Sequence, residues 1–269
     1  MRTPGYLIQS EDLDGPMNMA LDEVLWIDAA QGTPFVRFYG WAGRPVLSLG
    51  YFQCADEVRR DPRLCDLPCV RRLTGGGAIA HDHEITFSIA LPARLAPATS
   101  AMYGRVHHAI AVSLVELGIP ASVACGASSE GPSEALCFCR NDRFAVRVRG
   151  IKVLGSAQRR RAASVLMHGS LLLARSSAAP EVLGLREILE SDCCVESIRH
   201  ALLGAVTTAL EFELRPTELS GDLRRRATAL VDSKYRTTAW NERLQAIPAE
   251  TFREVAQPDQ IGPVKQLHC

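Results

Sequence analysis

Residues 69–92 read CVRRLTGGGAIAHDHEITFSIALP, and this stretch decides which fold the chain can form. Two strand-like runs, CVRRL and EITFSIAL, flank the triplet Gly75–Gly77, so the pattern predicts strand, glycine loop, strand. Three consecutive glycines weaken a strand and cost backbone entropy. They favour a loop whose bare backbone lies against a ligand, although a tight turn would use the same residues. The triplet fits neither the P-loop nor the dinucleotide-binding pattern.

Strand-like and helix-like patterns alternate outside this stretch. Apolar residues at helical spacing predict helices near 16–30 and 106–117, and the pattern is again helical after residue 195. Apolar runs between Gly and Pro predict two strands over 35–40 and 45–50, which we expect to pair with each other. Similar patterns predict a hairpin of two strands, one over 143–149 and one from residue 151, and a further strand over 164–173. Because strands and helices mix without a strand–helix–strand rhythm, we predict an α+β fold with a mixed, largely antiparallel sheet flanked by helices.

The composition is that of an ordinary globular chain. Of its 269 residues 47% are hydrophobic, and 30 basic residues balance 30 acidic ones, so no overall field attracts nucleic acid or an anionic membrane. No stretch has the length of a signal sequence core or the ~18 apolar residues of a membrane span, so we expect a cytoplasmic protein. No repeat or linker divides the chain, which predicts one domain over 1–269, with a core over about 15–215 and a helical segment over about 216–269.

The use of Lys and Cys indicates reactive groups. Twenty-seven of the thirty basic residues are Arg, and Lys152 is the only lysine before Lys234. Because Arg cannot give up its proton or act as a compact ammonium, Lys152 is either a functional residue or a chance placement on a solvated surface. Nine cysteines without an export signal are expected to be reduced, and one of them is a candidate reactive thiol.

A second group of small residues follows Lys152. In the strand-like segment 151–158, IKVLGSAQ, the residues 155–157 stand where β-branched residues would pack better. With His168 and Gly169 they predict the second wall of a narrow slot. A lone His on a strand is also common as a hydrogen-bonded structural residue.

Three strings, in this order, resemble the biotin/lipoate protein ligase and octanoyltransferase superfamily: FVRFYGWAGRPVLSLGYFQ (35–53), VRRLTGGGAIAHDHEITFSIALP (70–92) and GIKVLGSAQRRRAASVLMHGSLLL (150–173). The resemblance implies a catalytic domain that attaches octanoyl or lipoyl groups to a lysine of a carrier domain. It also implies that Lys152 points at the reacting carbonyl and that the glycine loop lines the acyl slot. The expected substrate-binding residues are Arg72, Gly75, Gly76, Gly77, His81, Gly155, Ser156, Ala157, His168 and Gly169.

The branches of this superfamily differ in how the acyl group is activated. Lipoate ligases use ATP, whereas octanoyltransferases take the acyl chain from acyl carrier protein onto a cysteine. Cys137 lies fifteen positions before Lys152 in a Cys-Phe pair, which resembles the ligase-like octanoyltransferases that act on the glycine-cleavage carrier protein. Residues 84–86, Glu-Ile-Thr, also resemble that branch. Gly77 and Arg140-Asn141-Asp142 resemble ligases instead.

These features predict an octanoyltransferase of protein lipoylation that forms a thioester on Cys137. Lys152 would stabilise the thiolate, and the amides of residues 155–157 would hold the oxyanion. The expected partners are octanoyl-acyl carrier protein and a lipoyl-carrier protein, either the glycine cleavage carrier or a dehydrogenase lipoyl domain. No cofactor or metal is expected, and neither nucleic acid nor membrane is an expected partner.

Two other functions remain open. One is an ATP- and Mg-dependent lipoate-protein ligase core without the small accessory domain, because the roughly 25 residues after the last expected helix are too few for a domain of ~50 residues. The other is a non-catalytic acyl- or lipoyl-binding module.

Further Arg and Cys residues have alternative interpretations. Arg71 and Arg72 would hold a phosphate of a pantetheine arm or of ATP. The run Arg159–Arg161 would either meet the acidic surface of a carrier protein or form a solvated loop. A zinc site is disfavoured because the spacings C-x3-C and C-x-C fit poorly with the usual ligand pairs; its ligands would be Cys65, Cys69, Cys137 and Cys139.

Overall fold

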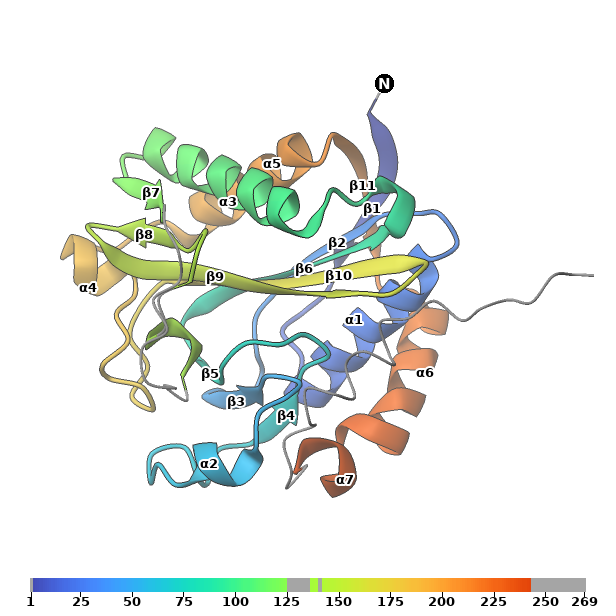
Figure 1. The fold of residues 1–269 in the computed structure, drawn as a ribbon, viewed down its shortest axis with the longest axis horizontal. Helices are drawn as coiled ribbons and strands as arrows, with labels where there is room; N and C mark the ends of the chain where they lie inside the picture. Colours follow the sequence, from blue (N-terminus) through green and yellow to red (C-terminus); the bar gives the residue numbers. More distant parts are fainter. Residues whose placement is uncertain (1, 125–135, 140–141, 243–269) are drawn as a thin grey trace, which may run out of the picture.

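A computed structural model describes residues 2–124, 136–139 and 142–242 of the chain (Figure 1). Arg140 and Asn141 lie outside the described residues, and so do two of the nine cysteines, Cys125 and Cys269, and the third lysine, Lys265.

Within the described residues, the chain forms one eight-stranded mixed sheet. In spatial order its strands are β11 (Phe212–Glu218), β1 (Thr3–Gln9), β2 (Phe35–Tyr39), β6 (Glu84–Pro92), β10 (Ser164–Leu172), β9 (Ile151–Arg160), β8 (Val146–Val148) and β7 (Ala121–Val123). β1 is parallel to β11 and β2, and the other neighbours are antiparallel. The predicted α+β fold with a mixed, largely antiparallel sheet is confirmed, and so is the predicted hairpin, which is formed by β8 and β9.

A second sheet in the described part of the chain has three strands in the order β4 (Cys69–Arg71), β3 (Val46–Leu49) and β5 (Ile79–His81). The predicted pairing of 35–40 with 45–50 is therefore wrong, since β2 and β3 belong to different sheets. The chain leaves the large sheet at Gly40, where a Cβ would lie 2.5 Å from the Asp12 carboxylate. Trp41 then turns inward, and its indole N–H donates to the Thr86 hydroxyl at 2.9 Å.

Helices cover both faces of the large sheet (Figure 1). α3 and α5 lie on one face, and α1 lies with the small sheet on the other, where α6 packs against α1. The helices are α1 (Gly15–Ala29), α2 (Ala55–Arg59), α3 (Thr99–Glu116), α4 (Leu185–Leu189), α5 (Val195–Ala209), α6 (Gly221–Leu230) and α7 (Thr238–Asn241), with 3-10 turns at Ala93–Leu95 and Cys137–Cys139 and a π-helical turn at Val231–Tyr235.

The first helix begins where the sequence predicts it. Asp14 caps α1 by accepting a hydrogen bond from the main-chain N–H of Met17 at 2.8 Å, and Pro16 fits the first turn because its fixed φ suits a helix. The other predicted helices, near 106–117 and after residue 195, correspond to α3, α5 and α6.

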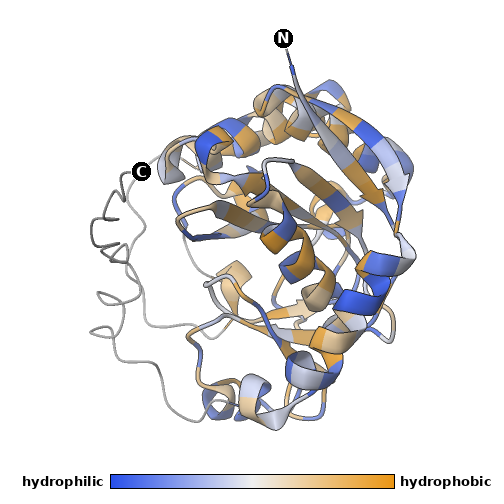
Figure 2. Ribbon diagram, turned by 90° about the vertical axis from the view of Figure 1, so that its right-hand side faces the viewer, coloured by the Kyte–Doolittle hydropathy of each residue, from blue (hydrophilic) through white to orange (hydrophobic). Residues whose placement is uncertain are grey.

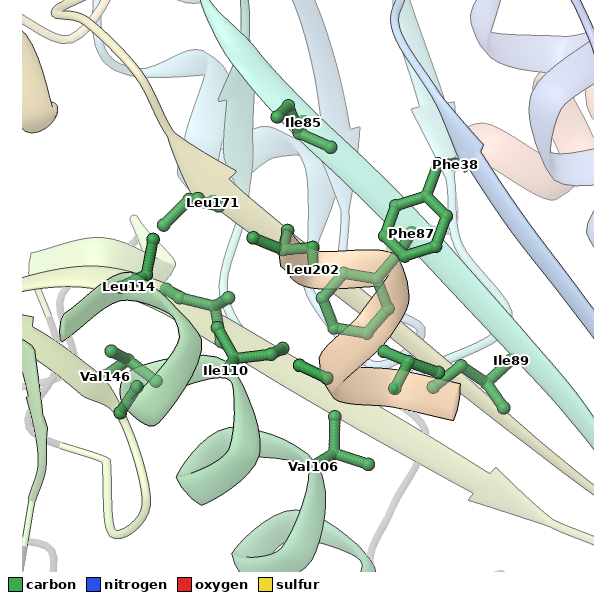
Figure 3. Packing of buried hydrophobic residues seen from close by; sticks show 14 of the residues in the cluster. Phe38, Ile85, Phe87, Ile89, Val106, Ile110, Leu114, Val146, Leu171 and Leu202 are labelled. Atoms are coloured by element: carbon green, nitrogen blue, oxygen red, sulfur yellow. The ribbon is translucent and has the colours of Figure 1, made fainter. Parts of the chain in front are cut away.

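The core explains why the central strands are almost continuously apolar. β6 and β10 are buried along their whole length, because helices or the small sheet cover both faces. Phe87 of β6 packs with Val106 and Ile110 of α3 and with Leu202 of α5 (Figure 3). In Figure 2 the central strands are mainly orange, whereas the outer helices carry both orange and blue residues. Each outer helix thus turns an apolar side to the sheet.

Four strands of the described chain were not predicted: β1, β5, β7 and β11. The segment FELRPTE of β11 is charged and half-exposed and contains Pro216, as edge strands often do, so its pattern does not indicate a strand. It pairs with β1 from Thr3 opposite Phe212 to Gln9 opposite Glu218. The predicted boundary near residue 215 therefore lies within a strand.

Gly169 of β10 gives the Phe87 ring its space. A Cβ at this position would lie 2.2 Å from Cζ of Phe87, which is fully buried on the neighbouring strand. Gly169→Ala should therefore lower the free energy of unfolding by about 2–3 kcal/mol, measured by urea denaturation. The matched control is Gly204→Ala in α5, where the added Cβ meets no heavy atom within 4 Å and should stabilise the helix by up to ~1 kcal/mol. Equal effects of the two substitutions would contradict this account.

Candidate active site

A cavity of about 190 Å³ lies between the glycine loop and strands β9 and β10. The two predicted walls of the slot line this one cavity. All residues predicted to bind substrate are part of its lining, together with Cys137: Arg72, Gly75, Gly76, Gly77, His81, Gly155, Ser156, Ala157, His168 and Gly169. The sequence analysis gave no role to the rest of the lining: Met19, Tyr39, Trp41, Thr74, Ile79, Thr86, Tyr103, Asp142 and Ser170.

Lys152 reaches the thiol of Cys137. Its side chain is 4% exposed and leaves β9 directly after the turn of the β8–β9 hairpin. Its Nζ lies 3.9 Å from Cys137 Sγ and donates to the Cys137 carbonyl oxygen at 2.8 Å. The Cys137 N–H in turn donates to the Ala78 carbonyl at 2.8 Å, which ties the 3-10 turn to the end of the glycine loop. The thiol and the ammonium are thus neighbours, held by main-chain contacts.

Asp142 completes this group. Its carboxylate forms an ion pair with Lys152 Nζ and lines the cavity, with its side chain 47% exposed. Gly155 leaves room for the lysine, because a Cβ there would lie 3.0 Å from Lys152 Cε. The small residue predicted as a wall of the slot therefore also gives space to the ammonium.

The glycine loop lies against the sulfur. Gly76 adopts a φ of +91°, and a Cβ there would be 3.9 Å from Cys137 Sγ and 4.0 Å from Ala157 Cβ. The carbonyl oxygen of Gly76 lies so close to Gly50 that a Cβ there would be 1.9 Å away, so this position requires glycine. From the sequence, Gly50 is predicted only as the end of a strand. Its required partner, Gly76, is distant in sequence, so no local pattern could reveal the contact.

Arg72 holds the glycine loop from inside. Its buried guanidinium donates to the carbonyls of Gly77 at 2.8 Å, Gly75 at 3.2 Å and Ser48 at 2.9 Å. Arg71 likewise donates to carbonyls, among them those of Gly50 at 2.9 Å and Asn241 at 2.8 Å. These bonds occupy the donors that the sequence analysis assigned to a phosphate. Both arginines thus act on the cavity through the backbone that they hold.

A buried relay connects Arg72 to His81. Arg72 donates to the Ser48 hydroxyl, which lies 2.5 Å from Nε2 of His81. Nδ1 of His81 lies 2.6 Å from a carboxylate oxygen of Glu84, and the Trp41 ring stacks on the imidazole at 3.8 Å. Burial lowers the pKa of His81 although the Glu84 charge acts in the opposite direction. Nε2 of the neutral ring therefore accepts a hydrogen bond from the Ser48 hydroxyl, whose oxygen in turn accepts one from Arg72.

A second buried network holds His168. Its Nδ1 lies 3.1 Å from the Thr74 hydroxyl, and its Nε2 lies 3.0 Å from the Asp22 carboxylate. Asp22 also accepts bonds from Arg37 at 3.2 Å and from the Tyr39 hydroxyl at 2.7 Å. Burial alone would raise the pKa of Asp22, but the hydrogen bond of His168 and the charge of Arg37 outweigh it and lower the pKa. The ionised Asp22 of α1 thus anchors the histidine beside the glycine loop.

The sequence analysis missed His107, which lies behind Ser156. His107 of α3 is buried, with Nδ1 2.6 Å from the Phe144 carbonyl and Nε2 2.6 Å from Ser156 Oγ. Burial lowers its pKa to about 4; the bond to Phe144 acts in the opposite direction, and the charge of Lys152 lowers the pKa further. A signal existed, since Tyr103, His107, Ile110 and Leu114 recur at helical spacing on one face.

Main-chain amides of β9 also border the cavity. In the described part of the chain the ladder between β8 and β9 ends at Leu154, whereas the ladder with β10 continues along residues 155–157. In an antiparallel strand alternate residues direct N–H to each edge, and the Arg161 N–H donates to the Ser164 carbonyl of β10, so the N–H groups of Gly155 and Ala157 face β10 and that of Ser156 faces away from it. Of the three amides predicted to hold an oxyanion, that of Ser156 is therefore the one that faces away from β10.

The Arg159–Arg161 run ends β9. Arg159 and Arg161 lie over aromatic rings, 4.0 Å from the centroid of Tyr51 and 4.4 Å from that of Trp26 respectively. Arg159 also donates to the Leu73 carbonyl at 3.0 Å. The solvated-loop alternative is therefore wrong for Arg159, and contact with a carrier protein stays a prediction.

The structure also bears on metal binding and on membrane insertion. Among the residues that the structure describes, no three His, Cys, Asp or Glu side chains are grouped so that they could hold a metal ion. Three of the four cysteines of the disfavoured zinc site, Cys65, Cys69 and Cys137, are thiols that form no disulfide. No helix in the described ranges is long and apolar enough to cross a bilayer.

Comparison with known proteins identifies the family. The model of the lipoyl protein ligase A/B catalytic domain matches residues 14–205. The chain therefore belongs to this family, and the resemblance found in the sequence is confirmed.

Two relatives are octanoyltransferases. Octanoyltransferase LipM of Symbiobacterium thermophilum is 32% identical and aligns with 90% of this chain and 100% of its own length. Octanoyltransferase LipM of Carboxydothermus hydrogenoformans is 31% identical, over 84% of this chain and 94% of its own.

Solved structures share the fold. Protein Ta0514 of T. acidophilum has a TM-score of 0.74 at 24% identity, covering 89% of this chain and 99% of that one. Lipoate-protein ligase A bound with ATP has a TM-score of 0.72 at 23% identity, covering 90% and 100%. At these identities the likeness establishes the fold.

Burial of neutral His107 makes stability depend on pH. The unfolded chain binds a proton at this residue near pH 6.5, whereas the folded chain does so only near pH 4, so stability is full above pH 6.5 and falls as the pH drops. Between pH 7 and pH 5 the loss from His107 should be about 2 kcal/mol by urea denaturation. In His107→Gln this part of the loss should disappear. The exposed residue His83, 54% accessible in its side chain, gives the control His83→Gln, which should keep the wild-type pH dependence. Equal pH dependence in wild type and His107→Gln would refute this.

Proposed function

We propose that the chain is an octanoyltransferase of protein lipoylation. In this proposal an octanoyl or lipoyl group passes from acyl carrier protein to a thioester on Cys137, and from there to a lysine of a lipoyl-carrier protein. The observation that supports it most directly is the 3.9 Å separation of Cys137 Sγ and Lys152 Nζ beside a cavity lined with small residues. The similarity to relatives named octanoyltransferase supports the same chemistry.

The first step is attack by sulfur. The thiolate of Cys137 adds to the carbonyl carbon of the octanoyl thioester, a new C–S bond forms, and the pantetheine thiolate leaves with the electrons of the old bond. In this proposal the ammonium of Lys152 stabilises the thiolate, because opposite charges this close attract each other. Asp142 shares that ammonium, so it limits how far the charge of Lys152 acts on the sulfur.

The second step reverses the first with an amine. The lysine amine of the carrier attacks the enzyme thioester, the C–N bond forms, the C–S bond breaks, and the nitrogen passes a proton to the departing sulfur directly or through Lys152. In both steps negative charge develops on the carbonyl oxygen. The main-chain amide of Ser156, which faces away from β10, suits that oxyanion, because a fixed donor needs no reorganisation during the reaction.

The cavity suits an acyl chain. Met19, Tyr39, Trp41 and Ile79 provide apolar surface, and the glycine loop removes side chains where the chain must enter. Since a thioester is already an activated acyl group, we propose that the reaction needs neither ATP nor Mg²⁺. The acceptor is a lipoyl-carrier protein, either the glycine cleavage carrier or a dehydrogenase lipoyl domain.

Cys137 should become acylated. After mixing with octanoyl-acyl carrier protein, intact-protein mass spectrometry should show one added octanoyl group on the wild type, and none on Cys137→Ala. The exposed neighbour Cys139 gives the matched control, since Cys139→Ala should still be acylated. Lipoate-dependent ATP–pyrophosphate exchange without acylation would favour the ligase alternative, and binding without turnover would favour the binding module.

Lys152 should be needed as a lysine. Lys152→Arg keeps the positive charge but not the compact, deprotonatable amine, so octanoyl transfer to a lipoyl domain should fall by about 10²-fold. Lys234 gives the control, because its Nζ is paired with Glu23 at 2.7 Å outside the cavity lining. Lys234→Arg should change the rate less than about threefold. Full activity of Lys152→Arg would exclude a proton-transfer role for this residue.

A further inference from the structure

We propose that the hydroxyl oxygen of Ser156 is a fixed hydrogen-bond acceptor that binds an N–H of the incoming lysine amine, and that His107 is the positioning residue that fixes it. The inference rests on the proposed octanoyl transfer and assigns a role in its second step. It follows from the hydrogen-bond partners of three groups, His107, Ser156 and the Phe144 carbonyl.

The two nitrogens of His107 face different partners. Nδ1 lies 2.6 Å from the carbonyl oxygen of Phe144, which can only accept a hydrogen bond. Nδ1 must therefore carry a proton. Nε2 lies 2.6 Å from the hydroxyl of Ser156, which can donate or accept.

The charge state of the imidazole decides the direction of the second bond. Burial and the neighbouring charge of Lys152 both lower the pKa of His107, to about 4 in all, although the Phe144 bond and Asp142 act in the opposite direction. At neutral pH the ring is thus neutral, and with its single proton on Nδ1 it can only accept at Nε2. Ser156 consequently donates its only hydroxyl hydrogen to His107.

A serine whose hydrogen is committed in this way has only lone pairs left to offer. An unconstrained serine hydroxyl rotates and serves as donor or acceptor as required. Here the hydroxyl can serve a ligand solely as an acceptor. Ser156 lines the cavity and is partly exposed.

The position of Ser156 relates this acceptor to the reacting groups. Its neighbour Gly155 lies against the Lys152 side chain, with 3.4 Å between a Cβ placed there and Nζ. Its other neighbour, Ala157, lies opposite Gly76, and Gly76 lies beside Cys137 Sγ. Ser156 lies between these two residues on β9, and the charges of Lys152 and Asp142 act on the imidazole to which its hydroxyl is bonded.

Among the reacting groups, the attacking amine is the one that needs an acceptor. The acyl chain and its thioester carry no N–H, whereas the amine keeps two hydrogens as it attacks. As the C–N bond forms and the C–S bond breaks, the nitrogen becomes more acidic, and its N–H bond to an acceptor strengthens. An acceptor fixed beforehand holds the amine lone pair on the carbonyl carbon and stabilises the transition state more than the ground state.

The test separates the two half-reactions. Enzyme acylated on Cys137 by octanoyl-acyl carrier protein is isolated, and single-turnover transfer to a lipoyl domain is followed by mass spectrometry. In Ser156→Ala, acylation should proceed as in the wild type, while transfer to the lysine should fall roughly tenfold, the loss expected for one hydrogen bond. Failure of acylation in the wild type would overturn the proposed function itself, which is a different outcome from an unchanged transfer rate in Ser156→Ala.

A thiol acceptor provides the sharper comparison. Transfer of the octanoyl group from Cys137 to dithiothreitol uses a sulfur nucleophile without N–H, so it should be unchanged in Ser156→Ala. A merely structural effect would slow both acceptors equally and would overturn the proposal. Slower acylation with normal transfer would also overturn it, because the serine would then serve the pantetheine arm.

Further variants complete the design. His107→Gln leaves the serine hydroxyl unlocked and should slow the amine transfer by a similar factor, and adding Ser156→Ala to it should cost little more. Ser156→Thr keeps the hydroxyl and should restore most of the rate. Ser122→Ala makes the same substitution on the exposed strand β7, outside the cavity lining, and should change nothing. Additive losses in the double variant would show that the two residues act independently.

Discussion

The buried guanidinium of Arg72 determines the shape of the candidate site. It places a positive charge in the interior and satisfies it with the carbonyls of Gly75, Gly77 and Ser48. A glycine loop has no side chains to hold it in place, so its conformation must be imposed from outside. Arg72 supplies that constraint through the loop carbonyls, and the relay through Ser48 and His81 fixes the arginine in turn.

The chemistry then depends on parts of the chain that only the tertiary structure brings together. Cys137 is tied to the end of the glycine loop through Ala78, Lys152 extends from β9, and His168 is anchored on α1 through Asp22. The thiol, the amine and the imidazole are thus each held by a contact with another part of the fold. Such support keeps reacting groups within the narrow tolerance that proximity catalysis requires.

Much of this arrangement could be predicted from local sequence. The glycine loop, the small residues after Lys152 and the rarity of lysine are all visible within short strings, and the cavity contains the residues that they indicated. His107 was missed because its partners, Ser156 and the Phe144 carbonyl, are far along the chain. Gly169 shows a further limit of the prediction. Its missing side chain leaves space for the Phe87 ring, so a small residue in a predicted cavity wall does not by itself indicate a role in binding.

The pairing of β1 with β11 bears on how the chain assembles. The first strand finds its outer neighbour about two hundred residues later, from Thr3 opposite Phe212 onward. During synthesis from the N-terminus, β1 must wait as an open edge until β11 has emerged, because a parallel neighbour cannot be replaced by a local hairpin. Contacts so distant in sequence slow folding, and an unpaired edge in the interval is a site where nascent chains can associate. The strand pairing expected to form last is therefore that of β1 with β11, whose sequence gives little indication of a strand.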